Sequence, residues 1–285
     1  MSNHLLSDDQ IAQYRSNGYL TAIPILTRAE ANDERAKMEA SEADIRALNL
    51  PKPPSTYLRA NCHLILTQVS RLVRHPKILG AVSSLIGPDL LAWSAEFFIK
   101  EPNTDKIVSW HQDLTYWGLG PTDEEVTAWL ALSPATCASG CMRFIPGSHK
   151  NDLLEHTDTF SDNNLLSRGQ EVAAKIDEAD AANIELRPGE MSLHHGRIFH
   201  ASGPNVTDDR RIGLAIRYLS PNVKQQVSKR DYAMLVKGWD RVGNFIPVAP
   251  PVTDLDPEDL RRREIILEDQ AEALSAGATQ NLRRG

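Results

Sequence analysis

The sequence predicts a mainly β fold with flanking helices, and two features of the chain support this. From residue 90 to about 220, short apolar or alternating runs follow one another between Gly, Pro and Asn, which is typical of an antiparallel sandwich or barrel. The segments before and after this region have helical patterns. We therefore expect one domain, with a helical N-terminal cover at about 7–88, a β core at about 90–220 and a C-terminal cover and helix at about 221–285.

Capping residues indicate where the predicted helices begin. Ser7 can cap a helix through residues 10–16, and Thr27 and Glu30 have capping-box spacing. The helix after Thr27 is expected to run to about Leu48, where a cluster of prolines follows. Two further helices are predicted at His75–Ile86 and Pro257–Leu274.

The predicted strands are short and closely spaced. They are Leu91–Lys100, Ile107–Asp113, Val126–Leu132, Met142–Ile145, Ile184–Leu186, Met191–His195 and Ile212–Leu219. The polar stretch Asp152–Ala182 interrupts this series, so we expect it to be an insertion over the mouth of the barrel. Thr115–Glu125 and Leu235–Phe245 are the other segments expected to cover the site.

Composition excludes several classes of protein. The 285 residues are 41% hydrophobic and 24% charged, and a net charge of −7 argues against a nucleic-acid partner, which would require a basic stripe. The three cysteines, Cys62, Cys137 and Cys141, form no CxxC pair. No apolar run approaches the roughly 18–20 residues of a membrane span, and no export signal is recognised, so we expect a cytoplasmic protein. The oligomeric state is not predicted.

The most informative segment is Ser109–Asp113, which contains an HxD motif. On a strand, His111 and Asp113 would point to the same side, about 7 Å apart. One imidazole and one carboxylate are two thirds of a facial triad, which suits Fe(II) and leaves three coordination positions open. HxD alone is a weak signal, because a surface strand with a His–Asp hydrogen bond has the same sequence.

A third metal ligand can come from the segment 189–205, which contains His194, His195 and His200. His194 and His195 are adjacent, so on a strand they face opposite sides and at most one faces inwards. We interpret both as buried structural histidines. His200, which precedes a turn at 202–205, is the expected ligand.

Arg211 is the candidate partner of a co-substrate carboxylate. The planar guanidinium group binds a carboxylate through two parallel hydrogen bonds. If Arg211 faces inwards, strand parity places Gly213, Ala215 and Arg217 on the same side, which is consistent with a ligand-filled interior. The neighbouring Arg210 is interpreted as a solvated charge at the start of the strand.

Three motifs together resemble the phytanoyl-CoA dioxygenase-like family of 2-oxoglutarate/Fe(II)-dependent oxygenases. They are Trp110-His111-Gln112-Asp113, the stretch from Gly140 to Lys150, and His200-x-Ser202-x-x-Asn205 followed by Arg211. The resemblance extends from about residue 7 to residue 250. It implies a double-stranded β-helix (jelly-roll, cupin-like) core.

The resemblance also implies the roles of individual residues. His111, Asp113 and His200 would hold Fe(II). Arg211 and Ser202 would bind the distal carboxylate of 2-oxoglutarate, in a pocket lined by Gln112 and Trp129. With O2 as the second co-substrate, the products would be succinate, CO2 and a hydroxylated substrate. Halogenating relatives have a small residue in place of the HxD carboxylate, so Asp113 favours hydroxylation.

The substrate is the least determined part of this prediction. Arg217, Arg143, His63 and Trp117 are the candidate contacts, and positive charge near the mouth favours a small anion of the amino acid or aminoalkyl phosphonate type. Three of these four candidates have an alternative: Arg217 could form a salt bridge, Arg143 could lie on the surface and His63 could be structural. Two alternative functions also stay open, a cupin-like metal oxygenase or isomerase that does not use 2-oxoglutarate, and a non-catalytic jelly-roll binding module.

Overall fold

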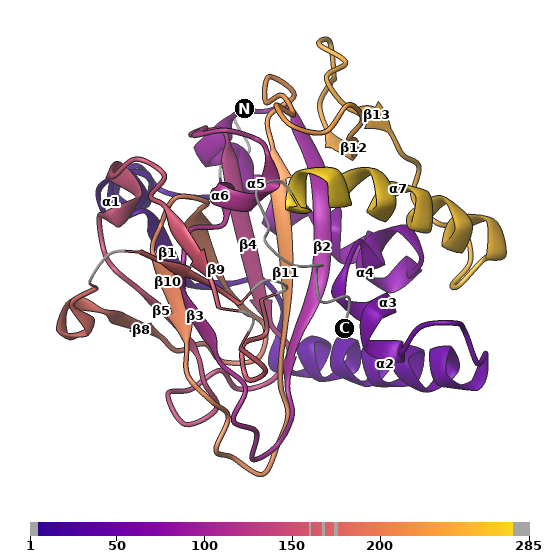
Figure 1. Cartoon of the computed structure of the whole chain (residues 1–285), viewed down its shortest axis with the longest axis horizontal. Helices are drawn as coiled ribbons and strands as arrows, with labels where there is room; N and C mark the ends of the chain where they lie inside the picture. Colours follow the sequence, from indigo (N-terminus) through magenta and orange to yellow (C-terminus); the bar gives the residue numbers. More distant parts are fainter. Residues whose placement is uncertain (1–4, 160, 167–168, 174–175, 276–285) are drawn as a thin grey trace.

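Two β-sheets packed against each other form the centre of the molecule (Figure 1). The computed structural model describes residues 5–159, 161–166, 169–173 and 176–275. The larger sheet has seven strands in the order β1-β9-β4-β11-β2-β12-β13, and the smaller has four in the order β3-β10-β5-β8. Their facing sides share a core that includes Trp129 and Ala215 from the large sheet and Phe144 and Ile184 from the small one. This confirms the predicted β core with flanking helices.

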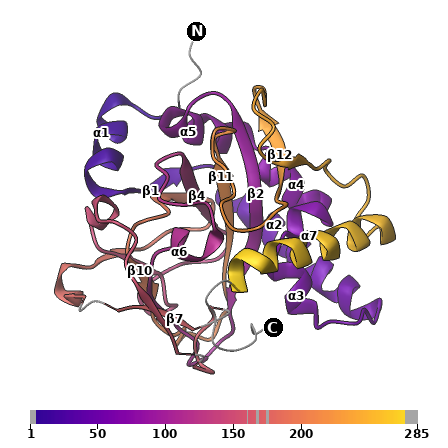
Figure 2. The same cartoon turned by 45° about the horizontal axis from the view of Figure 1, so that its top comes forward.

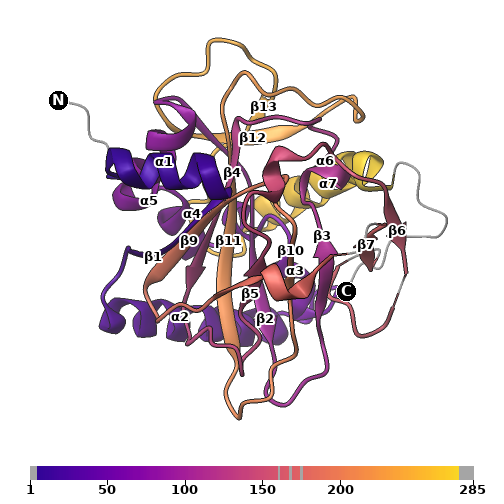
Figure 3. The same ribbon diagram turned by 90° about the vertical axis from the view of Figure 1, so that its left-hand side faces the viewer.

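The strands are mostly antiparallel and short. The large sheet contains β1 (Tyr19–Pro24), β2 (Leu90–Lys100), β4 (Glu125–Ala131), β9 (Glu190–His195), β11 (Arg211–Leu219), β12 (Tyr232–Lys237) and β13 (Ile246–Pro247). The small sheet contains β3 (Val108–His111), β5 (Met142–Phe144), β8 (Ala182–Ile184) and β10 (His200–Ser202). A separate ribbon of β6 (His156–Asp158) and β7 (Gln170–Val172) lies beside β3 (Figure 3).

The first two of the seven helices in the described residues begin directly after the predicted capping residues, Ser7 and Thr27. The helices are α1 (Asp8–Asn17), α2 (Arg28–Ala47), α3 (Pro54–Arg59), α4 (Thr67–Val73), α5 (Pro76–Ile86), α6 (Leu114–Trp117) and α7 (Pro257–Ser275), with short 3-10 turns at Cys62–Leu64, Ser148–Lys150 and Glu178–Asp180. Ser7 and Thr27 both form capping boxes, in which the hydroxyl accepts from the third helical N–H and the side chain of that residue returns the bond. Within the described residues, no helix has both the length and the apolar character needed to span a bilayer.

Helices cover one face of the large sheet and leave the other to the site. Met38 of α2, Leu58 of α3 and Ile266 of α7 belong to one apolar cluster with Phe97 of β2 and Ile216 of β11. Figures 1 and 2 show α7 on the same side of the molecule as α2, α3 and α4. Because successive side chains of a strand face opposite sides, the residues between these core positions point towards the small sheet.

The structure corrects several predicted boundaries. The strand predicted at Ile107–Asp113 ends at His111, and the one predicted at Ile184–Leu186 is Ala182–Ile184, with Leu186 making an isolated bridge to Ala135. Strands β1, β6, β7, β12 and β13 and helices α3, α4 and α6 were not predicted. β1 has a bulge at Ala22, whose φ is 56°, and this breaks the alternation that identifies a strand in sequence. Residues 160, 167–168 and 174–175 of the predicted insertion lie outside the described residues, and the prediction of one domain stays a prediction.

Candidate active site

His111, Asp113 and His200 are buried and form one cluster. The Nε2 atom of His111 lies 3.2 Å from Oδ1 of Asp113, and Nε2 of His200 lies 3.8 Å from the same oxygen. One ligand atom from each residue falls within 4.8 Å of the other two. Two imidazoles and one carboxylate with this spacing are the donor set of a mononuclear Fe(II) site.

Strand pairing brings the two histidines together. In the antiparallel pair of β10 and β3, His200 is directly opposite His111. Asp113 reaches the same point by a different route from the one predicted. The chain leaves the strand after His111, and Asp113 adopts helical dihedrals, φ −59° and ψ −48°, at the start of α6. The argument from strand parity was therefore wrong for Asp113, although the two side chains do meet.

Hydrogen bonds to the backbone orient both imidazoles. Nδ1 of His111 lies 2.9 Å from the carbonyl oxygen of Ser109, and Nδ1 of His200 lies 3.1 Å from that of Ile198. A carbonyl can only accept, so each Nδ1 carries the proton and each Nε2 offers a lone pair. This second contact is the usual means of fixing a metal-binding histidine. The two rings therefore present their lone pairs to the same point.

The charges in the cluster also suit a metal cation. Burial would raise the pKa of Asp113, but the surrounding imidazoles, His200 first, outweigh it and hold this pKa well below its usual value. Burial, together with the charge of His111, keeps the pKa of His200 well below its usual value. The result is an ionised carboxylate beside a neutral imidazole, which are the protonation states that bind a divalent metal.

A cavity with about 440 Å³ of empty space, counting its open mouth, contains this cluster. Most of the predicted site residues line it, namely His111, Asp113, His200, Ser202, Arg211, Trp129 and Arg217. Arg211, Ala215 and Arg217 all face it from β11, as strand parity predicted.

Arg211 lines one end of the cavity, and Lys100 lies beside it on the neighbouring strand; we call this the cationic end. Both are almost fully buried, with exposed fractions of 2% and 1%, and β11 and β2 place them directly opposite each other. Nζ of Lys100 donates to Oγ of Ser202 at 2.7 Å and to the carbonyl oxygen of Gly203. Within the described residues, no carboxylate forms an ion pair with either cation. A buried guanidinium without a counter-ion, beside a buried lysine that an anion would protonate, indicates a binding place for a carboxylate.

The environment of these cations shifts their pKa values downward. Burial lowers the pKa of Arg211 to about 10. Burial, followed by the charge of Arg211, lowers the pKa of Lys100 to about 6. Lys100 was not predicted from the sequence, because only the register of β2 against β11 places it beside Arg211.

Trp129 lies beside Arg211 because Gly213 makes room for it. The guanidinium carbon of Arg211 is 5.3 Å from the centre of the Trp129 ring. A Cβ atom built on Gly213 would lie 1.8 Å from the indole, so any other residue there would displace the ring. Glycine at 213 thus lets the indole close the wall behind the cationic end.

Arg217 faces the cavity from the other end of β11 and forms an ion pair with Glu96. Glu96 also lies 3.5 Å from Nε of Arg59. Both guanidinium groups contact the ring of Phe98, at 4.9 Å for Arg59 and 5.7 Å for Arg217. The salt-bridge alternative for Arg217 is therefore present in the structure, although two arginines share this one carboxylate, and the charges of Asp113 and Glu125 act on Arg217 without forming an ion pair with it.

Four predicted residues do not line the cavity. The side chain of Gln112 donates to the carbonyl oxygens of Asp152 and Arg197 and accepts from the N–H of Leu154, so it joins three segments instead of lining the pocket. Arg143 pairs with Glu178 at 2.6 Å. The other two are His63, buried within Cys62–Leu64 with a pKa lowered to about 3 by burial and by Arg263, and Trp117, whose ring contacts Arg217 at 5.2 Å.

His194 lies in the site and His195 does not. Strand β9 turns His195 outwards, where its Nε2 is 3.0 Å from Asp123. His194 lines the cavity, and its Nε2 is 3.9 Å from Oδ2 of Asp113. The interpretation of His194 as a satisfied structural residue was wrong, since its Nδ1 is buried without a partner among the described residues. Parity alone could not decide which of the two faced inwards.

Comparison with known proteins tests the resemblance of the motifs. The family model for phytanoyl-CoA dioxygenase matches residues 14–213, which is more than half of the chain. The chain belongs to the phytanoyl-CoA dioxygenase family. A probable phytanoyl-CoA dioxygenase of Caenorhabditis elegans is 24% identical over 249 residues, covering 79% of this chain and 78% of the relative.

Solved structures agree with this family assignment. The non-heme monooxygenase ThoJ is 34% identical, with a TM-score of 0.85 over 94% of this chain and 98% of that one. CytC3, solved with Fe(II) and alpha-ketoglutarate, has a TM-score of 0.64 at 22% identity over 86% of this chain, and so shows the shared fold alone. Family membership and the His–Asp–His cluster confirm that the chain is a 2-oxoglutarate-dependent non-haem iron oxygenase with a jelly-roll core.

Proposed function

We propose that this enzyme hydroxylates a small anionic metabolite, of the amino acid or aminoalkyl phosphonate type, with His111, Asp113 and His200 as its iron ligands. Bound iron and 2-oxoglutarate would supply the oxidising chemistry, in which O2 is consumed and succinate and CO2 are released. The observation that supports the substrate class is that Arg217, at the cavity wall, shares the carboxylate of Glu96 with Arg59.

The two ends of the cavity would bind different molecules, 2-oxoglutarate at the end with Arg211 and the substrate at the end with Arg217. Arg211, Lys100 and the Ser202 hydroxyl would hold the distal carboxylate of 2-oxoglutarate, and Trp129 would cover it. Arg217 is six residues further along β11, about 20 Å by strand rise, which is too far to share that carboxylate. It would instead orient the anionic group of the substrate, so that the bond to be oxidised faces the metal.

The surroundings of the metal would exclude water from the reaction. Leu166, Phe98 and Val108 line the cavity with apolar surface, and Nη2 of Arg59 donates to the carbonyl oxygen of Leu165 at 3.0 Å. This bond ties the segment that carries Leu166 to the helical cover. Three segments were predicted to cover the site. Among their described residues, Leu166 is the one that lines the cavity.

A relative supports an anionic substrate. A protein of Stutzerimonas stutzeri named probable alpha-ketoglutarate-dependent hypophosphite dioxygenase is 30% identical over 162 residues, covering 55% of each chain. Hypophosphite is a small anion. The two alternative functions are less favoured: an enzyme without 2-oxoglutarate leaves Arg211 and Lys100 without an anion, and a silent binding module does not need three aligned metal ligands.

The test is a substrate screen that measures succinate release with Fe(II), O2 and 2-oxoglutarate. Each compound is paired with an analogue in which only the anionic group is masked, for example an amino acid with its amide and an aminoalkyl phosphonate with its dimethyl ester. The compounds with the free anionic group should stimulate succinate release above the rate without substrate, and the masked analogues should not. Stimulation by the masked analogues alone would contradict the proposed substrate class, and an equal signal from Asp113→Ala would contradict the metal site.

A further inference from the structure

We infer that His194 is a positioning residue for the metal site, which holds the second oxygen of Asp113 and so keeps that carboxylate bound to the metal through one oxygen only. The inference rests on the ligand set of the proposed function. It adds a residue outside the three ligands, on a strand that contributes none of them.

The two oxygens of Asp113 face different groups. Oδ1 faces Nε2 of His111 at 3.2 Å and Nε2 of His200 at 3.8 Å, so it is the oxygen directed at the metal position. Oδ2 faces Nε2 of His194 at 3.9 Å. His194 is 2% exposed and does not belong to the set of ligand atoms that lie within 4.8 Å of one another. The carboxylate therefore lies between the metal position and this third imidazole.

The hydrogen-bonding inventory of His194 determines its tautomer. A neutral imidazole has one N–H and one lone pair, and an ionised carboxylate oxygen can only accept. With the proton on Nδ1, the Nε2 lone pair would face Oδ2 and a buried donor would be left without a partner, since Nδ1 has none among the described residues. The proton therefore belongs on Nε2, where it points at Asp113.

Packing holds the His194 ring in this place. Its centre is 5.1 Å from the ring of Phe144 and 5.1 Å from that of His200. On the backbone, β9 pairs residue 194 with Thr127 of β4 on one side and with Tyr19 of β1 on the other. The separation of 3.9 Å between Nε2 and Oδ2 is longer than a hydrogen bond, so the inference requires the two groups to come closer when the metal is bound.

If Asp113 binds the metal through one oxygen only, the number of open coordination positions stays at three. Three protein donors leave three positions, which are the number that a chelating keto acid and O2 require. A carboxylate that bound through both oxygens would occupy one of these. Residues that orient a metal ligand in this way typically contribute 10–100-fold to metal affinity.

The experiment compares His194→Gln with His194→Asn in the full chain. The amide nitrogen of Gln reaches the position of Nε2, whereas that of Asn reaches only the position of Nδ1. Co(II) is titrated into the metal-free proteins, with the visible Co(II) absorption band as the readout, and the melting temperature is measured in EDTA to monitor folding. His195→Gln on the opposite face of β9 is the matched control, and it should bind Co(II) as the wild type does.

We expect His194→Asn to bind Co(II) 10–100-fold more weakly with an altered absorption band, and His194→Gln to stay within about 3-fold of the wild type. Equal binding by the wild type and His194→Asn would overturn the inference, as would equal weakening in both variants, which would make His194 a ligand or a packing residue. An unchanged affinity with a raised KM for the prime substrate would overturn it in favour of a substrate contact. If the wild type itself bound no Co(II), the proposed ligand set would fail instead.

Discussion

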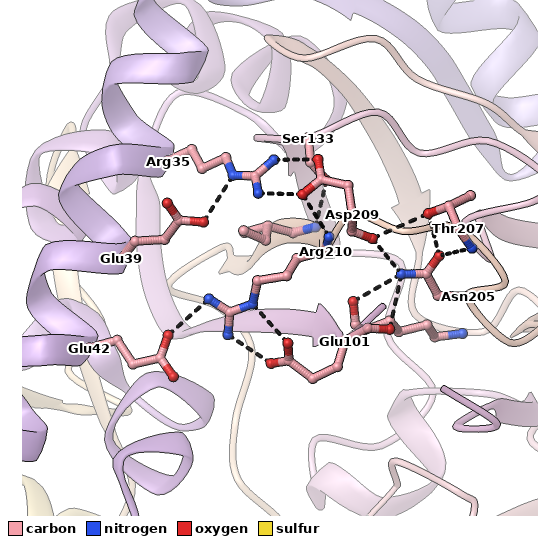
Figure 4. Close-up of polar contacts among 11 residues, drawn as sticks. Arg35, Glu39, Glu42, Glu101, Ser133, Asn205, Thr207, Asp209 and Arg210 are labelled. Atoms are coloured by element: carbon pink, nitrogen blue, oxygen red, sulfur yellow. Dashed lines mark hydrogen bonds and ion pairs between the residues drawn. The ribbon is translucent and has the colours of Figure 1, made fainter. Parts of the chain in front are cut away.

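Arg210 and Arg211 are neighbours in the chain, yet their surroundings are opposite. Arg210 points outwards, where its Nε and Nη2 donate to the two oxygens of Glu101 at 3.0 and 2.8 Å and its Nη1 donates to Glu42 at 2.9 Å (Figure 4). Arg211 points inwards, is 2% exposed and has no carboxylate partner among the described residues. The charge of Arg210 is neutralised by carboxylates of the protein itself. The charge of Arg211, which is proposed to bind a ligand, is buried without such a partner.

The histidines of β9 repeat this contrast. His195 faces outwards and is paired with Asp123, while His194 faces the cavity and has one nitrogen without a partner. On β11 and on β9, a side chain that faces the cavity is directly next in sequence to one that faces away from it. Each inner residue therefore has an outer neighbour that can serve as its control.

The largest effect is expected at the metal. His200→Ala removes one of three ligands and should abolish both iron binding and turnover, because only His111 and Asp113 then remain to bind the ion. His195→Ala, on the outer side, should retain the metal. The measurement is the iron content after dialysis together with succinate formation. Retained iron in His200→Ala, with loss of iron in His195→Ala, would contradict the ligand assignment.

The next largest effect is expected for the inner arginine. Arg211→Ala leaves a buried carboxylate of 2-oxoglutarate without its bidentate partner, at a cost on the order of 2–5 kcal/mol. The apparent KM for 2-oxoglutarate should rise by several tens-fold or more, with a smaller change in the KM for the prime substrate. Arg210→Ala should leave both constants within about 2-fold, since Glu101 and Glu42 are partly exposed to solvent. An Arg211→Ala enzyme with normal 2-oxoglutarate dependence would remove Arg211 from the site.

Arg217 combines the features of Arg210 and Arg211, because it lines the cavity and is also paired with Glu96. In Arg217→Met, Glu96 keeps its contact with Arg59, so the folded state should lose little stability. We expect turnover coupled to an anionic substrate to fall at least 10-fold, with a nearly unchanged melting temperature and 2-oxoglutarate decarboxylation in the absence of substrate. A parallel loss of stability and of both activities would show that Arg217 is only structural.

Lys100 should give the smallest effect, and it concerns pH. Its pKa of about 6 leaves it mostly neutral at pH 7.5 in the free enzyme. A carboxylate bound beside it raises this pKa, so binding takes up a proton, and the affinity for 2-oxoglutarate should increase as the pH falls from about 9 towards 6. Lys100→Met should bind 2-oxoglutarate only a few-fold more weakly at pH 8 and should lose the pH dependence. Calorimetry across this pH range measures both, and equal slopes for the two proteins would contradict the prediction.

The features that could be predicted from the sequence are those that depend on residues close together in the chain. The helix cap at Ser7, the capping box at Thr27 and the inward side of β11 all follow from spacing within a few residues. The residues that sequence reasoning missed depend on pairing between distant segments. Lys100 meets Arg211, and Glu96 meets both Arg59 and Arg217, only through the register of β2 against β11 and α3.

Proximity in sequence also misled in one case. Gln112 lies between two metal ligands, but Asp113 reaches the cluster from a helical turn and not from a strand, so the side chain at 112 turns away to three backbone groups. The backbone conformation after His111 decides this, and HxD spacing is compatible with either conformation.

Strand β11 also fixes the length of the chamber between its two charged ends. Arg211, Gly213, Ala215 and Arg217 stand in one row, and a β-strand cannot stretch, so the span from co-substrate to substrate is set by the backbone. The indole of Trp129 leaves no room for a side chain at Gly213. Ala215 lies in the same row and has a side chain that lines the cavity. A Val or Leu at 215 would shorten the chamber from within and exclude longer substrates while leaving the iron ligands untouched. Under the proposed roles of Arg211 and Arg217, position 215 is therefore the place where we expect a single substitution to change the length of substrate that the enzyme accepts.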